Sequence, residues 1–272
     1  MILDISKFTN KKELIDYVKT NKEDIISLKK AQVKHTNPFG VIEIEQNVSK
    51  VFNTSNVDDV ASGTIKRTII GNTYNYMDSH YDVHLNGIFS KSISERKNKI
   101  LHLHDHLYQT TAKVGKFEDV YEKEIEWMDL GINKLGRTMA LFGDSNIYKD
   151  LNSQIFNQYL KGEIDQHSVG MVYVKVELAI DDDMDREGYA NWNTYLPRLG
   201  NPEKAIELGF FFVVKEAKLI EISAVLEGSN DLTPTIPNKQ TQEEEPTIEK
   251  VTQEIKEPEI NFDEIVKNIK IK

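Results

Sequence analysis

The chain has 272 residues, enough to bury a sizeable hydrophobic core, and its 44 acidic and 34 basic side chains give a net charge of -10. This negative field repels nucleic acid, so we expect no nucleic-acid partner. The absence of cysteine excludes disulfides, thiolate metal sites and a cysteine nucleophile. The first residues lack the pattern of a signal peptide, and no window approaches the roughly 20 apolar residues of a membrane span. We therefore expect a soluble, intracellular protein without a membrane partner.

Two short helices are predicted near the N-terminus. Asn10 and Glu13 have capping-box spacing before apolar residues at helical intervals, and Asn21 with Asp24 repeats this signal. From Pro38 onwards, short β-branched or alternating runs at 41–45 and 64–76 predict strands. Residues 1–60 are therefore interpreted as a helical N-terminal extension with a first strand.

Helix and strand signals alternate through the middle of the chain. Apolar residues at helical spacing predict a helix between Tyr76 and the segment LHLHDH, and a second helix that ends at Gly162. Strict alternation over 172–180 predicts a strand. The mostly apolar segment 209–226 predicts a pair of strands joined by a turn near Glu216, after a long polar excursion at 181–205.

The composition changes after Gly228, where Thr, Gln, Glu and Pro replace aromatic residues. Such a segment does not bury enough apolar area to offset the entropy lost on ordering. Residues 229–272 are predicted to form a disordered acidic linker that ends in a short amphipathic helix. That helix either docks on a partner or stays solvated.

Three histidines alternate in LHLHDH, residues 101–106, in a chain with seven histidines. On a strand, His102, His104 and His106 would point to one face, and His80 and His84 would be further metal donors. The three positions span roughly 13 Å of backbone, so one tetrahedral ion does not easily bind all of them. A metal site is therefore the weaker interpretation, and no metal or cofactor is predicted.

Serine catalysis is the stronger interpretation. It needs a nucleophile, a base within hydrogen-bond reach and a group that orients the base. Ser168 stands between a predicted helix and a predicted strand, and Gly170 follows it, which lets backbone N–H groups approach a developing oxyanion. Most serines before a strand are turn or capping residues, so Ser168 alone is a weak signal.

The order of several short motifs adds to this signal. Along the chain follow DSHYDVHLNGIF, the His104–Asp105 pair, KVGK at 113–116, the SVG that begins at Ser168, and EISAV from Glu221. This order resembles the capsid-maturation (prohead) proteases of tailed bacteriophages, which are related to the herpesvirus assembly proteases. The resemblance covers roughly residues 64 to 228. It loosens where the family often has proline and this chain has LEGSN and LNGIF.

The resemblance implies a role for each motif residue. His104 would be the base, Ser168 the nucleophile and Glu221 the group that orients the imidazole, with main-chain N–H groups near Val169 and Gly170 at the oxyanion.

Other residues are candidates for the third member of the site. The herpesvirus relatives use a second histidine in place of the acid, so His102 and His106 remain alternatives to Glu221. Asp105 would be a poor orienter of His104, because adjacent strand residues face opposite ways.

The resemblance also implies a fold and a function. The fold would be α+β, a closed or nearly closed, mainly antiparallel β-barrel surrounded by helices and herpesvirus-protease-like, over residues 61–228. The function would be that of a serine endopeptidase that cleaves scaffold and major capsid proteins, and itself, during prohead maturation. It would act inside the viral procapsid in the bacterial host cytoplasm, as a homodimer or higher self-association. The alternatives are a non-enzymatic scaffold or assembly protein with a protease-like fold, and a His-ligated metallohydrolase.

Overall fold

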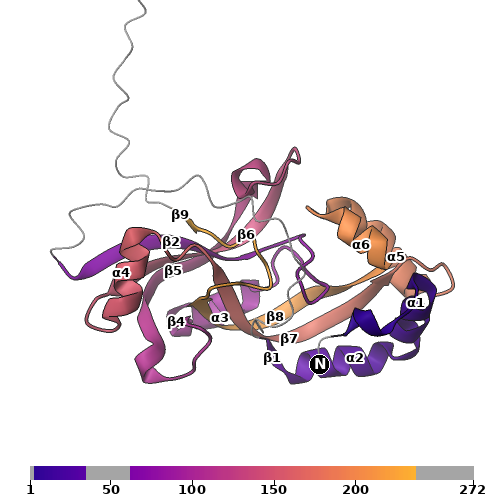
Figure 1. Ribbon diagram of the computed structural model, residues 1–272, viewed down its shortest axis with the longest axis horizontal. Coiled ribbons are helices and arrows are strands. Elements are labelled where there is room, and N and C mark those ends of the chain that lie inside the picture. The colour runs from indigo at the N-terminus through magenta and orange to yellow at the C-terminus, as the bar shows by residue number, and fades with distance from the viewer. Residues whose placement is uncertain (1–2, 35–61, 237–272) are drawn as a thin grey trace, which may run out of the picture. The chain divides into compact units, whose positions relative to one another are not determined.

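The structure is a computed structural model that describes residues 3–34 and 62–236. Its strands form one sheet in the order β1-β7-β8-β4-β5-β6-β2-β9, and β3 lies beside β8 (Figure 1). The strands are β1 (Val33–Lys34), β2 (Thr64–Thr73), β3 (Asp82–His84), β4 (Leu101–His104), β5 (Lys113–Glu126), β6 (Arg137–Tyr148), β7 (His167–Ile180), β8 (Phe210–Ala224) and β9 (Thr235–Ile236).

The fold is α+β, as expected, but the sheet is mixed and does not close into the expected barrel. Most neighbouring strands are antiparallel, whereas β3 and β4 both run parallel to β8. In the described residues the hydrogen-bonded order has two ends, β1 and β9. The sheet instead curls so that β2 comes close to β8, which is not its neighbour in the strand order. A Cβ on Gly71 of β2 would lie only 2.9 Å from the side chain of Ile222 in β8, so glycine permits this close approach.

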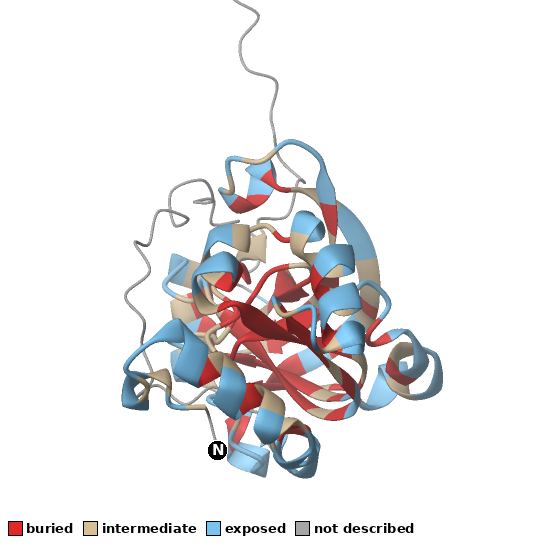
Figure 2. Cartoon of the chain, turned by 90° about the vertical axis from the view of Figure 1, so that its right-hand side faces the viewer, coloured by how far each residue is buried: buried red, intermediate tan, exposed pale blue. Residues whose placement is uncertain are grey.

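The described part of the chain also contains helices around the sheet. They are α1 (Lys11–Thr20), α2 (Lys22–Ala31), α3 (Ser90–Arg96), α4 (Ser153–Lys161), α5 (Arg186–Tyr195) and α6 (Pro202–Leu208). Buried residues gather in the strands, while the helices expose one side to solvent (Figure 2). Among these helices, none is both long and apolar enough to cross a membrane.

The helices predicted from the sequence are confirmed at α1, α2, α3 and α4. The Asn10 side chain caps α1 by accepting a hydrogen bond from the backbone N–H of Glu13, as the capping-box spacing predicts. Gly162 ends α4 with a φ of 72°, a left-handed conformation that suits glycine. The polar excursion at 181–205 contains α5 and the first residues of α6, which the sequence did not indicate.

The segment 209–226 was wrongly predicted to hold two strands. It forms the single long strand β8, which pairs with β7 along its whole length. The register shifts on both sides of the Lys175–Glu216 pair, so the charged break marks an irregularity of the ladder and not a turn. Because β8 continues through this point, its last residues lie beside the start of β7.

The folded part of the chain continues beyond Gly228. Leu232 and Thr233 are buried, and Thr233 Oγ1 donates to the carbonyl of His167 over 2.6 Å. Strand β9 then pairs with β2. Residues 229–236 therefore belong to the compact unit and not to the predicted linker. The rest of that linker with its terminal helix (237–272), and the predicted strand at 41–45, lie outside the described residues.

A pair of leucine variants tests this boundary. Leu232→Ala should lower the free energy of unfolding by about 2–4 kcal/mol, because it leaves a cavity at a side chain that is 1% exposed. Leu226→Ala, at a side chain that is 95% exposed, should change it by less than about 0.5 kcal/mol. Urea unfolding measures both variants. Equal effects would contradict the packing of residues 229–236.

Candidate active site

Strand β4 ends at His104 in a tight turn. Asp105 and His106 have φ values of 51° and 54°, and the N–H of Leu107 donates to the carbonyl of His104 over 3.1 Å. Two successive left-handed residues define a type I′ turn. This backbone is strained for non-glycine residues, although Asp and His tolerate it better than most. The turn interrupts the alternation of the strand, so His106 does not share the face of His102 and His104.

The carboxylate of Glu221, on β8, is the centre of the site. It is 1% exposed, Oε1 lies 2.6 Å from His106 Nδ1, and Oε2 accepts a 2.7 Å hydrogen bond from Ser223 Oγ. The Ser223 hydroxyl in turn accepts from the backbone N–H of His106 over 3.2 Å. A buried carboxylate is stable only with such donors, so these contacts hold the turn, the imidazole and the carboxylate as one unit.

The same contacts assign the proton of the imidazole. A carboxylate can only accept, so His106 donates from Nδ1 to Glu221. The other ring nitrogen, Nε2, is then the one that can take a proton from a substrate or nucleophile.

The β7–β8 ladder places Ser168 in this group. Ser168 pairs with Ser223, and Gly170 pairs with Glu221. Paired residues of neighbouring strands point to the same face, so the Ser168 side chain lies on the face of Glu221 and Ser223. Ser168 is 6% exposed. Ser168 and the backbone N–H of His106 thus both lie against Ser223.

Gly170 makes room for the carboxylate. A Cβ at this position would lie 2.0 Å from Glu221 Oε1, which no side chain can do. Main-chain groups near Val169 and Gly170 are expected to support the oxyanion, and the packing gives Gly170 a second role that the sequence did not indicate. The side chain of Val169 points to the opposite face, paired with Ile222 and buried in the core.

His104, the expected base, lies elsewhere. It pairs with Ala224, on the face opposite to Glu221 and Ser223, and its Nδ1 lies 2.9 Å from Asp105 Oδ2. The two neighbours can meet because Asp105 belongs to the turn, where the alternation of a strand no longer holds. The structure brings His106, and not His104, to Glu221, on the sheet face that Ser168 shares.

His102 belongs to a buried chain of hydrogen bonds on that opposite face. Its Nδ1 lies 2.7 Å from Ser145 Oγ, and its Nε2 lies 3.1 Å from the hydroxyl of Tyr159. The Tyr159 hydroxyl lies 2.9 Å from His167 Nε2, and His167 Nδ1 lies 2.9 Å from the carbonyl of Thr233. Because a carbonyl only accepts, His167 donates from Nδ1 to Thr233 and accepts from the Tyr159 hydroxyl at Nε2. Tyr159 then accepts from His102 Nε2, and His102 Nδ1 accepts from the Ser145 hydroxyl. Both imidazoles are neutral in this arrangement.

Burial sets the protonation state of these two histidines. It lowers the pKa of His102 to about 3, with a further contribution from the electrostatic interaction between the two imidazoles when both are protonated. Burial also lowers the pKa of His167 to about 4, against the smaller effect of its bond to Thr233. The pair is therefore structural, and neither histidine is suited to act as a base near neutral pH.

One group of three potential metal ligands converges within residues 3–34 and 62–236, namely Asp78, His80 and Asp82. Lys29 Nζ lies 2.5 Å from Asp82 Oδ1, and the Tyr173 hydroxyl donates to Oδ2 over 2.8 Å. Both oxygens of Asp82 thus bind protein donors, and the buried ammonium repels a cation. His84, the other predicted donor, lies 3.0 Å from the same Tyr173 hydroxyl. The cluster is accounted for as a polar network within the fold.

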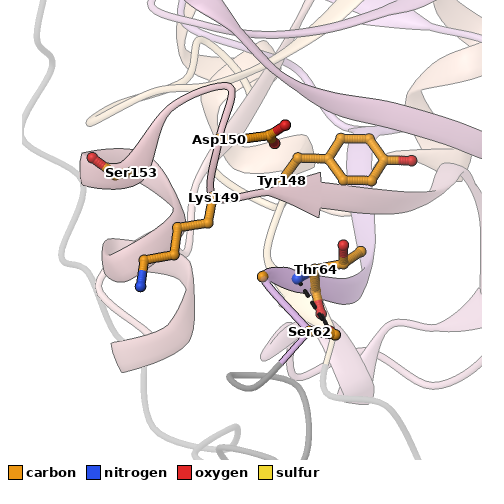
Figure 3. Close-up of a pocket in the computed structure, with 7 residues that line it drawn as sticks. Ser62, Thr64, Tyr148, Lys149, Asp150 and Ser153 are labelled. Carbon is orange, nitrogen blue, oxygen red and sulfur yellow. Dashed lines mark hydrogen bonds between the residues drawn. The ribbon is translucent and has the colours of Figure 1, made fainter.

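A pocket of about 590 Å³ lies where β2 begins and β6 ends, and none of its lining residues belongs to this site (Figure 3). It is lined by Ser62, Gly63, Thr64, Tyr148, Lys149, Asp150 and Ser153. The Lys149 and Asp150 side chains point in different directions (Figure 3). The pocket therefore offers no nucleophile next to a base and orienter.

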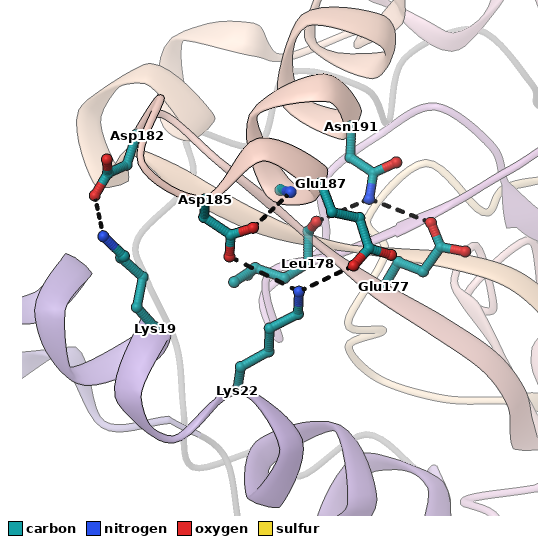
Figure 4. Close-up of polar contacts among 9 residues, drawn as sticks. Lys19, Lys22, Glu177, Leu178, Asp182, Asp185, Glu187 and Asn191 are labelled. Carbon is teal, nitrogen blue, oxygen red and sulfur yellow. Dashed lines mark hydrogen bonds and ion pairs between the residues drawn. The ribbon is translucent and has the colours of Figure 1, made fainter.

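The N-terminal helices reach the sheet through buried and exposed contacts. Lys29 of α2 is buried and lies 4.3 Å above the ring of Phe212. In partly buried positions, Lys19 pairs with Asp182 over 2.5 Å, and Lys22 pairs with Asp185 and with the exposed Glu187 at the start of α5 (Figure 4). Residues 3–34 are thus part of the compact unit that holds the site.

Comparisons with known proteins found no relative. No protein-family model, curated protein or solved structure matches the chain. The geometry of Ser168, His106 and Glu221, together with the order of the motifs, is therefore the basis for assigning a function.

The neutral pair His102 and His167 should make folding sensitive to acid. An unfolded histidine takes up a proton below its ordinary pKa of 6.5, whereas the folded pair resists protonation down to about pH 3 and 4. Their stabilisation is therefore complete above pH 6.5 and is lost as the pH falls towards 4. The free energy of unfolding should fall by about 2 kcal/mol per histidine between about pH 7 and 5. Urea titrations of the wild type, His102→Gln and His167→Gln measure this loss. Variants that keep the full pH dependence would contradict it.

A substitution at Gly170 tests its contact with the carboxylate. Gly170→Ala should lower the free energy of unfolding by about 1–3 kcal/mol, because the new methyl group displaces Glu221. In a Glu221→Ala background, the same change should cost much less, since the space is vacant. Urea unfolding of the four proteins in this cycle gives the coupling. An equal cost in both backgrounds would show that Gly170 does not act through Glu221.

Proposed function

We propose that the protein is a serine endopeptidase with Ser168 as nucleophile, His106 as base and Glu221 as orienting acid. The observation that carries this proposal is the 2.6 Å contact from His106 Nδ1 to a buried Glu221, on the sheet face that Ser168 shares. These are the residue types and roles of a serine-protease triad. The proposal assigns the base to His106, two residues after His104.

Each group has a defined step in this mechanism. His106 Nε2 takes the Ser168 proton as Oγ attacks a peptide carbonyl, which gives a tetrahedral oxyanion. The imidazolium then gives its proton to the leaving amine, and water hydrolyses the acyl-enzyme by the reverse path. Glu221 stays ionised and stabilises the imidazolium.

The oxyanion needs donors of its own. We assign them to main-chain N–H groups around Ser168, Val169 and Gly170. Each such donor is worth about 3 kcal/mol in the transition state.

The strained turn supports a catalytic role for His106. Successive left-handed, non-glycine residues persist only where surrounding contacts hold them, and they cluster at functional sites. Here the contacts are the donation from Asp105 N–H to the Ala224 carbonyl and the bonds of His106 to Ser223 and Glu221. The turn thus points the His106 imidazole at the carboxylate, whereas in a continued strand this side chain would point to the opposite face.

The proposed substrates follow from the order of the motifs. Its resemblance to prohead proteases makes scaffold and major capsid proteins, and this chain itself, the substrates that we propose. The site of action is then the procapsid, where self-association of the protease is also proposed. A non-enzymatic assembly protein would need no ordered nucleophile, base and acid.

Intact-mass measurement of cleavage tests the function. Wild-type protein incubated alone, and with its capsid and scaffold partners, should give fragments, while Ser168→Ala should give none. His106→Gln should lower the cleavage rate by roughly 10⁴-fold to 10⁶-fold, because the proton of Ser168 has no acceptor.

His104→Gln is the matched control. It removes a histidine two residues away on the opposite face, so its cleavage rate should stay within about threefold of wild type. Loss of cleavage in His104→Gln but not in His106→Gln would return the base to His104. Identical masses for wild type and Ser168→Ala under every condition would reject the peptidase.

A further inference from the structure

We infer that Ser223 is a positioning residue that keeps His106 in the tautomer and orientation needed to accept the Ser168 proton. The catalytic role of Ser223 rests on the proposed function, whereas the effect of Ser223 on the His106 imidazole can be measured without any substrate.

Ser223 lies between the three strands that build the site. It is fully buried on β8, paired with Ser168 on β7 and with Leu103 on β4. Its Oγ donates to Glu221 Oε2 over 2.7 Å and accepts from the backbone N–H of His106 over 3.2 Å. A single hydroxyl group thus joins the orienting acid to the turn that carries the base.

The bond to Glu221 fixes the rotation of the carboxylate. With Oε2 held by Ser223, Oε1 faces His106 Nδ1 at 2.6 Å. In this orientation Oε1 lies where a Cβ on residue 170 would stand, so only glycine is compatible with it. Without the hydroxyl group, Oε2 loses a donor in a buried position, and the carboxylate gains freedom to rotate away from His106.

The bond to the backbone of His106 supports the left-handed turn. The N–H of His106, whose φ is 54°, donates to the Ser223 hydroxyl, and the loss of this bond leaves both the turn and the imidazole less restrained. Ser223 therefore acts on the base twice, through its backbone and through its carboxylate partner.

The consequence for catalysis is the choice of tautomer. With Glu221 in place, the proton sits on Nδ1, and Nε2 can accept the Ser168 proton. A neutral imidazole without this partner favours the proton on Nε2. In that tautomer Nε2 is a donor, and the wrong nitrogen faces the nucleophile.

Nitrogen NMR of the imidazole tests the inference directly. Correlations from carbon-bound ring protons report the nitrogen-15 shifts of neutral His106, and His106→Gln identifies its signals. Wild type should show the proton on Nδ1, and Ser223→Ala should shift the population to Nε2. Unchanged shifts in Ser223→Ala would overturn the inference.

Two further variants make the result specific. Ser145→Ala removes another buried strand serine that bonds a different histidine, His102, so it should leave the His106 shifts at wild-type values. Ser223→Cys keeps the volume but offers only a weak donor, so it should give an intermediate tautomer ratio even if Ser223→Ala folds poorly. A wild-type ratio in Ser223→Cys would equally overturn the inference.

Kinetics separates this inference from the proposed function. Ser223→Ala should lower kcat roughly 100-fold with KM within about twofold, since orientation and not binding is lost. If wild type cleaves nothing, the peptidase proposal fails, while the tautomer measurement still decides the role of Ser223. A shifted tautomer with unchanged kcat would overturn the positioning role.

Discussion

The buried carboxylate of Glu221 is the constraint around which the candidate site is built. A charge that is 1% exposed needs donors on both oxygens, and His106 and Ser223 supply them. It also needs room, which only glycine at position 170 leaves. The left-handed turn at Asp105–His106 brings the His106 imidazole to the Glu221 carboxylate. The buried carboxylate thus accounts for three features of the site: the strained turn, the glycine at position 170 and the hydrogen bonds of the Ser223 hydroxyl.

The strand order makes this arrangement possible. β8 lies between parallel β4 and antiparallel β7, so the end of β4 and the start of β7 meet at the same end of β8. One face of this junction holds Ser168 and Glu221. The other face holds the chain of hydrogen bonds through His102, Tyr159 and His167, which connects the start of β7 to Thr233. Hydrogen-bonded groups on the opposite face therefore hold the strand that carries Ser168.

The sequence indicated much of this fold and named all three residues of the proposed site, with His106 only as an alternative third member. Helical spacing found the first four α-helices, and strict alternation found β7. The order of motifs selected Ser168 and Glu221. The choice of His104 over His106 failed to anticipate the geometry because alternation was extended past the end of β4, where two left-handed residues reverse the direction of the side chain. No periodic signal marks the point where a strand gives way to a turn.

Other differences have equally local causes. The hairpin of β5 and β6 was not predicted, because β5 carries a charged run from Glu122 to Glu124 that conceals its alternation. β8 was divided at Glu216 because a charged pair in mid-strand resembles a turn. Asn230 and Thr233 are buried through hydrogen bonds and not through apolar area, so composition placed them in a linker.

The most direct test of the site is the position of covalent labelling by a fluorophosphonate probe, read by peptide mass spectrometry. The account predicts one adduct on Ser168 that persists in His104→Gln and is lost in His106→Gln and Glu221→Ala. Labelling of another residue, or labelling of Ser168 that survives His106→Gln, would contradict it.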